Sequence, residues 1–287
     1  MRLFIISILS VFVFKIYACD FCGGSAFGLD ANMISSSNEN SIGLLFSSKN
    51  YKLINENQGY QSWLFSWTLN GTYKPHNKVQ IKAFLPLLFQ TLPKDKNQVG
   101  LGDLMVITSY TPLNIVGNKH SVLHRVTLSG GLELPTGKDN SNDELLTTIP
   151  FSSKSVDFLL GGSYALSIKR YVMGTSILGK VNTKNQKNYK YGNSIEAIWQ
   201  NSIRVNAKDA QLFPFVGVKY NWQKEDISNN FTRIYTGGYL FSEIMGIQVN
   251  YYKHKLAAQI DLPFYKRMKS TTSENGNMYS IQYTYQF

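Results

Sequence analysis

The sequence is poor in long apolar runs, in cysteine and in histidine. After residue 18, none of its apolar stretches reaches the ~20 residues that a transmembrane helix needs, which argues against a helical inner-membrane protein. Its two cysteines form no Cys-x-x-Cys-His motif, so covalent haem is not indicated. No glycine pair is followed by Gly-Lys-Ser/Thr, so no phosphate loop is predicted.

The first 18 residues have the pattern of a secretory signal peptide. Arg2 supplies the positive start, Leu3 to Phe14 form the apolar stretch, and Ala18 is the small residue before the cleavage point. Without Arg2 and Lys15, the formal charge of the chain falls from +11 to +9. We therefore expect residues 1–18 to be removed, residues 19–40 to form a periplasmic segment or plug, and residues 41–287 to fold as one domain.

Alternation of apolar and polar residues with period 2 recurs along the whole of that domain. Such alternation is typical of strands with one apolar face, and the runs are longer than most soluble strands. Aromatic residues cluster at the ends of the apolar faces, as lipid interfaces favour. The sequence predicts strands at 41–51, 61–74, 78–90, 102–112, 122–134, 156–168, 171–181, 193–205, 212–222, 243–252, 256–265 and 278–287. The fold class is therefore all-β, a transmembrane antiparallel up-and-down barrel of about twelve strands in the bacterial outer membrane.

Connections between these strands alternate between long and short. The long ones cover 52–60, 91–101, 135–155, 182–192, 223–242 and 266–277. Long external loops and short periplasmic turns are typical of outer-membrane barrels, and they require an even number of strands when both termini face the periplasm. We therefore interpret residues 223–242 as one loop, although Ile234 to Leu240 could be a strand.

The last strand ends the chain on an aromatic residue. Its outward face predicts a recognition signal for the barrel-assembly machinery, carried by Tyr279, Ile281, Tyr283, Tyr285 and Phe287. An ordinary amphipathic strand is the alternative.

Short motifs near strand ends resemble a family of transporter-type outer-membrane barrels, the MetA-pathway family of phenol degradation. They are Gly-Leu-Gly-Asp at 100–103, Gly-Leu-Glu-Leu-Pro-Thr-Gly at 131–137, Thr-Gly-Gly at 236–238 and Gln-Ile-Asp-Leu-Pro at 259–263. The resemblance covers roughly residues 41 to 287 and implies transport of an aromatic compound, without implying any catalytic or binding residue. A Cys-x-x-Cys pair after the signal peptide is similar to one in relatives from the Bacteroidetes.

The pair Cys19 and Cys22 leaves three interpretations open. The two thiolates could bind copper or zinc, although a closed zinc site needs four ligands. They could form a disulfide in the oxidising periplasm, or have no special role. Cys19 could also carry a lipid, but Tyr17 fits a lipidation motif poorly. No other cofactor is expected.

Charged residues of both signs fall on the polar faces, which would line the lumen. Alternate residues of a strand point to the same face, and a residue out of step with the apolar face therefore points into the lumen. On this basis the predicted lumen-lining residues are Lys82, Asp103, Arg125, Glu133, Asp157, Lys180, Glu196, Arg204, Lys219 and Asp261. Five of these residues are positive and five are negative, which argues against a strongly anion-selective pore lined by a single sign of charge. The positive surplus lies in loops, where residues such as Lys94, Lys184 and Lys187 could bind lipopolysaccharide phosphates or form a solvated surface.

Catalysis is not predicted. His76, His120, His124 and His254 fall in turns or at strand ends, without a defined Ser-His-acid grouping. The leading hypothesis is a passive channel with a polar lumen for a small solute, in contact with outer-membrane lipid and with no nucleic-acid partner. The alternatives are a non-conducting structural or interaction barrel, a membrane-embedded hydrolase, and a metal-handling protein that uses the Cys19/Cys22 pair.

Overall fold

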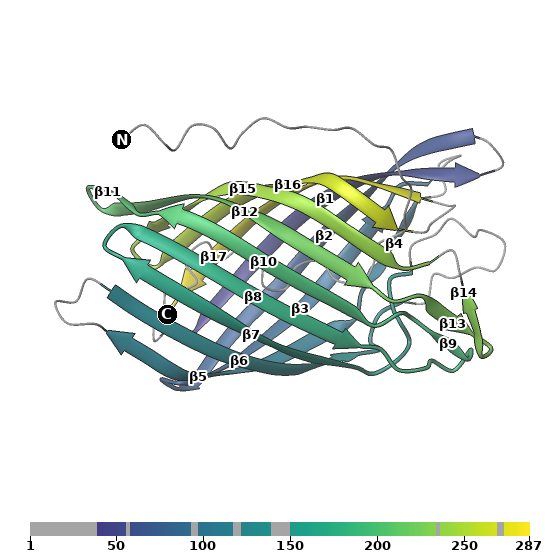
Figure 1. The fold of residues 1–287 in the computed structure, drawn as a ribbon, viewed down its shortest axis with the longest axis horizontal. Helices are drawn as coiled ribbons and strands as arrows, with labels where there is room; N and C mark the ends of the chain where they lie inside the picture. The colour runs from purple at the N-terminus through teal and green to yellow at the C-terminus, as the bar shows by residue number, and fades with distance from the viewer. Residues whose placement is uncertain are drawn as a thin grey trace.

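Twelve long antiparallel strands close into a barrel in the computed structural model (Figure 1). The structure describes residues 39–55, 58–92, 97–116, 122–138, 150–233, 236–268 and 273–287. None of these residues lies in a helix long and apolar enough to cross a membrane. The barrel strands are β1 (Ser41–Asn55), β2 (Gln58–His76), β3 (Val79–Gln90), β5 (Leu104–Val116), β6 (Val122–Leu134), β7 (Asp157–Ile168), β8 (Tyr171–Val181), β10 (Ser194–Ile203), β12 (Ala210–Gln223), β15 (Gly238–Tyr251), β16 (His254–Met268) and β17 (Ser273–Gln286).

Each barrel strand pairs with its neighbours in the chain, and β17 pairs with β1 to close the ring. The main sheet has fourteen strands, and two of them, β4 (Gln98–Leu101) and β11 (Val205–Ala207), are short additions to β3 and β12. The remaining twelve confirm the predicted strand number. Closure leaves no free sheet edge among these strands, so their backbone groups find partners inside the wall.

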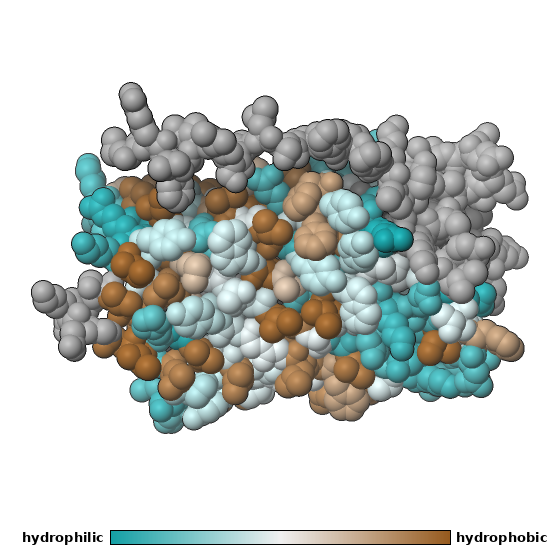
Figure 2. All heavy atoms as spheres, in the orientation of Figure 1, coloured by the Kyte–Doolittle hydropathy of each residue, from teal (hydrophilic) through white to brown (hydrophobic). Residues whose placement is uncertain are grey.

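The outer surface of the wall is apolar because alternate residues of each strand point away from the lumen. Large apolar side chains are therefore exposed along the strands, among them Leu44, Trp67, Leu87, Leu128 and Leu160. Figure 2 shows brown and pale side chains over much of the middle of the visible wall. Exposed apolar area of this extent requires lipid around it.

Long and short connections lie at opposite ends of the barrel. The short-turn end carries the two-residue connections 169–170, 208–209 and 252–253, together with Asn40 and Phe287, whose backbone groups bond at 3.0 Å. The long-loop end carries the connection from β6 to β7 and the one from β12 to β15. This separation agrees with the predicted alternation, and the rule for outer-membrane barrels puts the short-turn end on the periplasmic side.

Several details of the predicted organisation were wrong. The predicted loop 91–101 contains β4, and the predicted loop 182–192 contains the two-residue strand β9 (Tyr189–Lys190). Residues 223–242 are not one loop, because β13 (Asp226–Ser228) and β14 (Phe231–Arg233) form a hairpin there and β15 begins at Gly238. Residues 52–60 and 266–277 are mostly strand, since β1, β2, β16 and β17 extend beyond their predicted ends. The predicted strand 193–205 is interrupted at Arg204, between β10 and β11. The alternation of apolar and polar residues within one strand did not predict these strand extensions, because pairing with a neighbouring strand stabilises them.

A small three-stranded sheet of β9 (Tyr189–Lys190), β13 and β14 stands at the long-loop end, beyond the barrel wall (Figure 1). Asp226 anchors it: its carboxylate accepts hydrogen bonds from the Tyr189 hydroxyl at 2.5 Å and from the Gly192 amide at 2.7 Å. Burial raises the pKa of the Asp226 carboxyl above its ordinary value. Burial, and next the Asp226 carboxylate, raise the pKa of Tyr189, so this hydroxyl stays a hydrogen-bond donor.

The predicted signal peptide, the cysteine pair and most of the predicted plug lie outside the described residues. The same holds for His120 and Lys94. The predictions for these residues therefore stay predictions.

Candidate functional site: the barrel lumen

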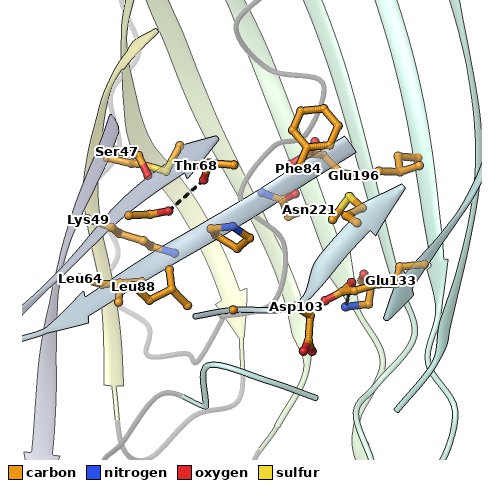
Figure 3. Close-up of a pocket in the computed structure, with 18 of the residues that line it drawn as sticks. Ser47, Lys49, Leu64, Thr68, Phe84, Leu88, Asp103, Glu133, Glu196 and Asn221 are labelled. Carbon is orange, nitrogen blue, oxygen red and sulfur yellow. Dashed lines mark hydrogen bonds and ion pairs between the residues drawn. The ribbon is translucent and has the colours of Figure 1, made fainter. Parts of the chain in front are cut away.

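The barrel encloses a cavity of about 270 Å³ to which all twelve barrel strands contribute side chains. Its wall includes Ser47 and Lys49 of β1, Thr68 of β2, Glu133 of β6 and Asn221 of β12. In Figure 3, Lys49 and Leu64 stand on one side of this space, and Glu133 and Asn221 stand on the other. The cavity therefore runs across the lumen and is not a pocket in one part of the wall.

The lumen is less polar than the alternation predicted. Apolar side chains line it from several strands: Leu45, Leu64, Phe84, Leu88, Met105, Leu159, Leu178 and Leu240. Phe84 and Leu88 share the inward face of β3 with Lys82, because residues two and four apart point to the same side of a strand. The predicted wall of charges and hydroxyls was therefore incomplete, since both faces of several strands carry apolar residues.

Two groups of buried charges occupy the wall. On β6, β7 and β8, the Lys180 ammonium lies 2.5 Å from the Glu133 carboxylate and 3.5 Å from the Asp157 carboxylate. On β12 and β16, Lys219 forms an ion pair with Asp261, whose other oxygen accepts a bond from the Gln259 side-chain amide at 2.5 Å. Pairing of this kind offsets the cost of removing these charges from water.

Asp103 is the most connected carboxylate at the long-loop end of the lumen. One oxygen accepts hydrogen bonds from the Gly137 amide at 2.9 Å and the Ser152 hydroxyl at 2.7 Å. The other accepts from the Ser153 amide at 2.7 Å and the Ser153 hydroxyl at 3.1 Å. Asp103 is 7 % exposed, so these donors take the place of water around a buried charge.

The bonds to Asp103 join two of the motifs on which the family resemblance rests. Asp103 ends the first motif and Gly137 ends the second, and the two meet beside the paired ends of β5 and β6. A Cβ atom on Gly137 would lie 2.8 Å from the carbonyl carbon of Gly102 and 2.9 Å from an Asp103 oxygen. Only glycine allows the backbone to approach the carboxylate this closely.

Residues 150–155, which we call the inward segment, cross the lumen from the β7 side. Phe151 packs in one buried cluster with Tyr51, Leu64 and Leu92, which belong to β1, β2 and the residues after β3. In the order of the ring, these strands lie well away from β7. Ser152 and Ser153 line the cavity at the point where Asp103 holds them. The inward segment therefore narrows the lumen near its long-loop end.

Six predicted lumen residues line the cavity: Asp103, Glu133, Lys180, Glu196, Lys219 and Asp261. Asp157 and Arg125 are buried in the wall, and Arg125 bonds Asn114 at 3.4 Å. Lys82 and Arg204 are half-buried nearer the short-turn end, where Arg204 bonds the Ser167 hydroxyl at 3.3 Å.

Lys49 and the inward segment were not predicted from the sequence. Lys49 had a signal, because it shares the inward face of β1 with Leu45 and Ser47. The inward segment had a weaker one, an apolar Phe151 within a serine-rich stretch.

The described histidines lie away from the cavity. The His124 ring accepts or donates a bond at 2.8 Å with the Tyr164 hydroxyl, and His254 does the same with Tyr283 at 2.7 Å. Both histidines lie on the same face of their strand as a lipid-exposed leucine, His124 with Leu128 and His254 with Leu256. Within the described ranges, no group of three or more metal-binding side chains could hold an ion.

Comparison with known proteins agrees with this geometry. The profile of a family described as "Putative MetA-pathway of phenol degradation" matches residues 68–259. The chain belongs to this family. The matched part includes both motifs that meet at Asp103, the Thr-Gly-Gly motif at 236–238, and only the first residue of the motif at 259–263. Among curated proteins, no sequence gives a significant match.

Among solved structures, the chain is similar to an outer-membrane channel from Pseudomonas putida F1, with a TM-score of 0.65 and 12% identity over 87% of this chain and 96% of that one. The β domain of the Bordetella autotransporter BrkA has a TM-score of 0.48, with 11% identity over 87% of this chain and 100% of the other. The first likeness confirms the fold of an outer-membrane barrel, and with it the location in the bacterial outer membrane.

Proposed function

We propose that this protein is a passive outer-membrane channel for a small solute and not an enzyme. The observation that carries the proposal is the cavity inside the barrel, because side chains of all twelve strands border it. A barrel filled completely by its own side chains would leave no such space. Twelve strands enclose an interior between those of eight-stranded filled barrels and sixteen-stranded porins.

The lining of the cavity suits solutes that have both apolar and polar parts. Leu45, Phe84 and Leu178 offer apolar contact, while Lys49 and Asn221 offer hydrogen-bonding groups at the same cavity. No single sign of charge dominates, because Lys180 and Lys219 are matched with carboxylates. A weakly selective passage fits this lining better than a strongly charged filter does.

The inward segment favours one competing function, a non-conducting barrel. It narrows the lumen at Asp103, and Phe151 secures it to the opposite wall. The proposal requires that solute passes beside this segment or that the segment moves.

Ion conductance of the purified protein in planar lipid bilayers separates the two functions, with solute uptake into liposomes as the second readout. We design a blocking variant, Ser47→Trp, which places an indole in the cavity from β1. The matched control is Leu44→Trp on the same strand, where the side chain is exposed to lipid. We expect conductance in the wild type and the control and a reduced conductance in the blocking variant.

Two results would contradict the proposal. One is a wild-type protein that inserts into the bilayer, shows the heat-dependent gel mobility of a folded barrel, and passes neither ions nor solute. The other is an equal conductance for Ser47→Trp and Leu44→Trp, because the current would then not pass through the cavity.

A further inference from the structure

Exposed cations surround the short-turn end of the barrel. Five of them, which we call the turn-end rim, are exposed in the short turns or next to them: Lys78, Lys169, Arg170, Lys208 and Lys253. None of the five forms an ion pair with the part of the chain that the structure describes. The acidic groups described at this end are the side chains of Glu39 and Asp209 and the carboxylate of Phe287, so the five rim cations leave a positive excess.

Two rim lysines occupy backbone positions that lysine does not favour. Lys169 has a φ of 53° and Lys208 a φ of 48°, each at the first residue of a two-residue turn. Glycine or asparagine adopts this left-handed conformation at lower cost and is the usual choice in such turns. Turn formation therefore does not by itself favour lysine at these two positions.

The rim lies next to a belt of exposed aromatic side chains. Tyr73, Tyr171, Tyr251 and Tyr252 are between 41% and 72% exposed, and each lies within a few residues of a rim cation. Tyrosine is enriched at the level where the hydrocarbon of a membrane meets the headgroups. The rim cations lie one or a few residues further along the turns, so their long side chains could reach the headgroup phosphates.

We propose that the turn-end rim binds the phosphodiester headgroups of anionic phospholipids in the leaflet around the short-turn end. Lysines near a membrane surface gain free energy from anionic headgroups, and long side chains reach them from the aromatic belt. The rim takes lipid rather than cell-wall polymer because its cations adjoin lipid-exposed side chains such as Tyr171 and Ile168. This site does not depend on whether the lumen conducts.

The test measures which lipids stay bound to the purified protein. Wild type is incubated in detergent with equal amounts of phosphatidylglycerol and phosphatidylcholine, repurified, and its retained lipids are quantified by mass spectrometry. The rim variant is Lys169→Gln, Lys208→Gln and Lys253→Gln. The control variant is Lys184→Gln, Lys187→Gln and Lys224→Gln, which removes the same charge from exposed positions at the long-loop end.

We expect wild type and the control variant to retain phosphatidylglycerol at least about fivefold over phosphatidylcholine, the factor that one lysine near an anionic surface contributes. The rim variant, which keeps only Lys78 and Arg170 of the five rim cations, should show a clearly weaker preference for phosphatidylglycerol than the wild type and the control variant, while keeping the gel mobility of a folded barrel. Equal retention by the wild type, or an equal loss of preference in both variants, would overturn the proposal. A different result would assign the rim to the cell wall and also overturn the proposal. In that case the wild type would sediment with purified peptidoglycan and show no lipid preference, and the rim variant would no longer sediment.

Discussion

Replacing Asp103 by asparagine changes the inward segment with almost no change in side-chain volume. In the wild type, the two carboxylate oxygens accept four hydrogen bonds, three of them from Ser152 and Ser153. The asparagine oxygen can still accept the bonds from Gly137 and Ser152. Its amide nitrogen, however, faces the amide of Ser153, and two donors cannot bond each other.

The size of the effect follows from the lost bond. A hydrogen bond to a charged group contributes about 1.5–3 kcal/mol, and about 1.4 kcal/mol is a factor of ten in an equilibrium. Asp103→Asn should therefore lower the ratio of docked to released inward segment by roughly 10- to 150-fold. Release widens the lumen, so the variant should show a larger or more frequently open conductance than the wild type.

Single-channel recording in planar bilayers measures this change, and hydrogen exchange of residues 150–155 reports release of the segment directly. Asp209→Asn is the matched control, since Asp209 is exposed at the other end of the barrel. Faster exchange with an unchanged current would show that the inward segment does not limit the passage. Unchanged exchange would show that the Asp103 hydrogen bonds do not hold the segment in place, and would refute this reasoning.

Three further predictions concern stability. Asp261→Asn removes the carboxylate partner of buried Lys219 and should lower the free energy of unfolding in urea by about 3–5 kcal/mol. Adding Lys219→Met should recover much of this loss, because it removes the unpaired buried charge. No recovery in the double variant would contradict the pairing. Gly137→Ala should cost about 1–3 kcal/mol through overpacking, while Gly71→Ala, with no atom within 4 Å of the added Cβ, should stay within about 0.5 kcal/mol. Because burial raises the pKa of Asp226, the free energy of opening the small sheet should fall as pH rises from about 4 through the raised pKa and then stay level. Protection factors from hydrogen exchange should show this slope in wild type and none in Asp226→Asn, and a slope that persists in the variant would exclude Asp226 as its cause.

Most of the fold could be predicted because the barrel is built from a repeated local pattern. Each crossing needs an apolar outward face, so the period-2 runs that include Trp67 and Leu128 located β2 and β6 closely. The C-terminal strand then required an even number of strands. The extensions of β1 and β2, and the hairpin of β13 and β14, gave no such signal because they lie beyond the lipid and are held by pairing.

The candidate site could be predicted only in part. Strand parity identified charged residues such as Glu133 and Lys180, because parity depends on the strand alone. It could not reveal that Lys180 joins two carboxylates from two other strands, which depends on register between strands. The inward segment depends on a contact between Asp103 and Ser153, fifty residues apart, which no local pattern encodes.

Passage of solute through the cavity bordered by the twelve strands can be tested from inside the cavity itself. A cysteine is placed there, Ser47→Cys, in a background with Cys19→Ser and Cys22→Ser, and the current is recorded while a membrane-impermeant thiol reagent is added to either side. Leu44→Cys on the lipid-exposed face of β1 is the control. We expect the reagent to lower the current through Ser47→Cys and to leave Leu44→Cys unchanged. A current that is absent, or that persists unchanged after Ser47→Cys is shown by mass spectrometry to be modified, would contradict passage through the cavity.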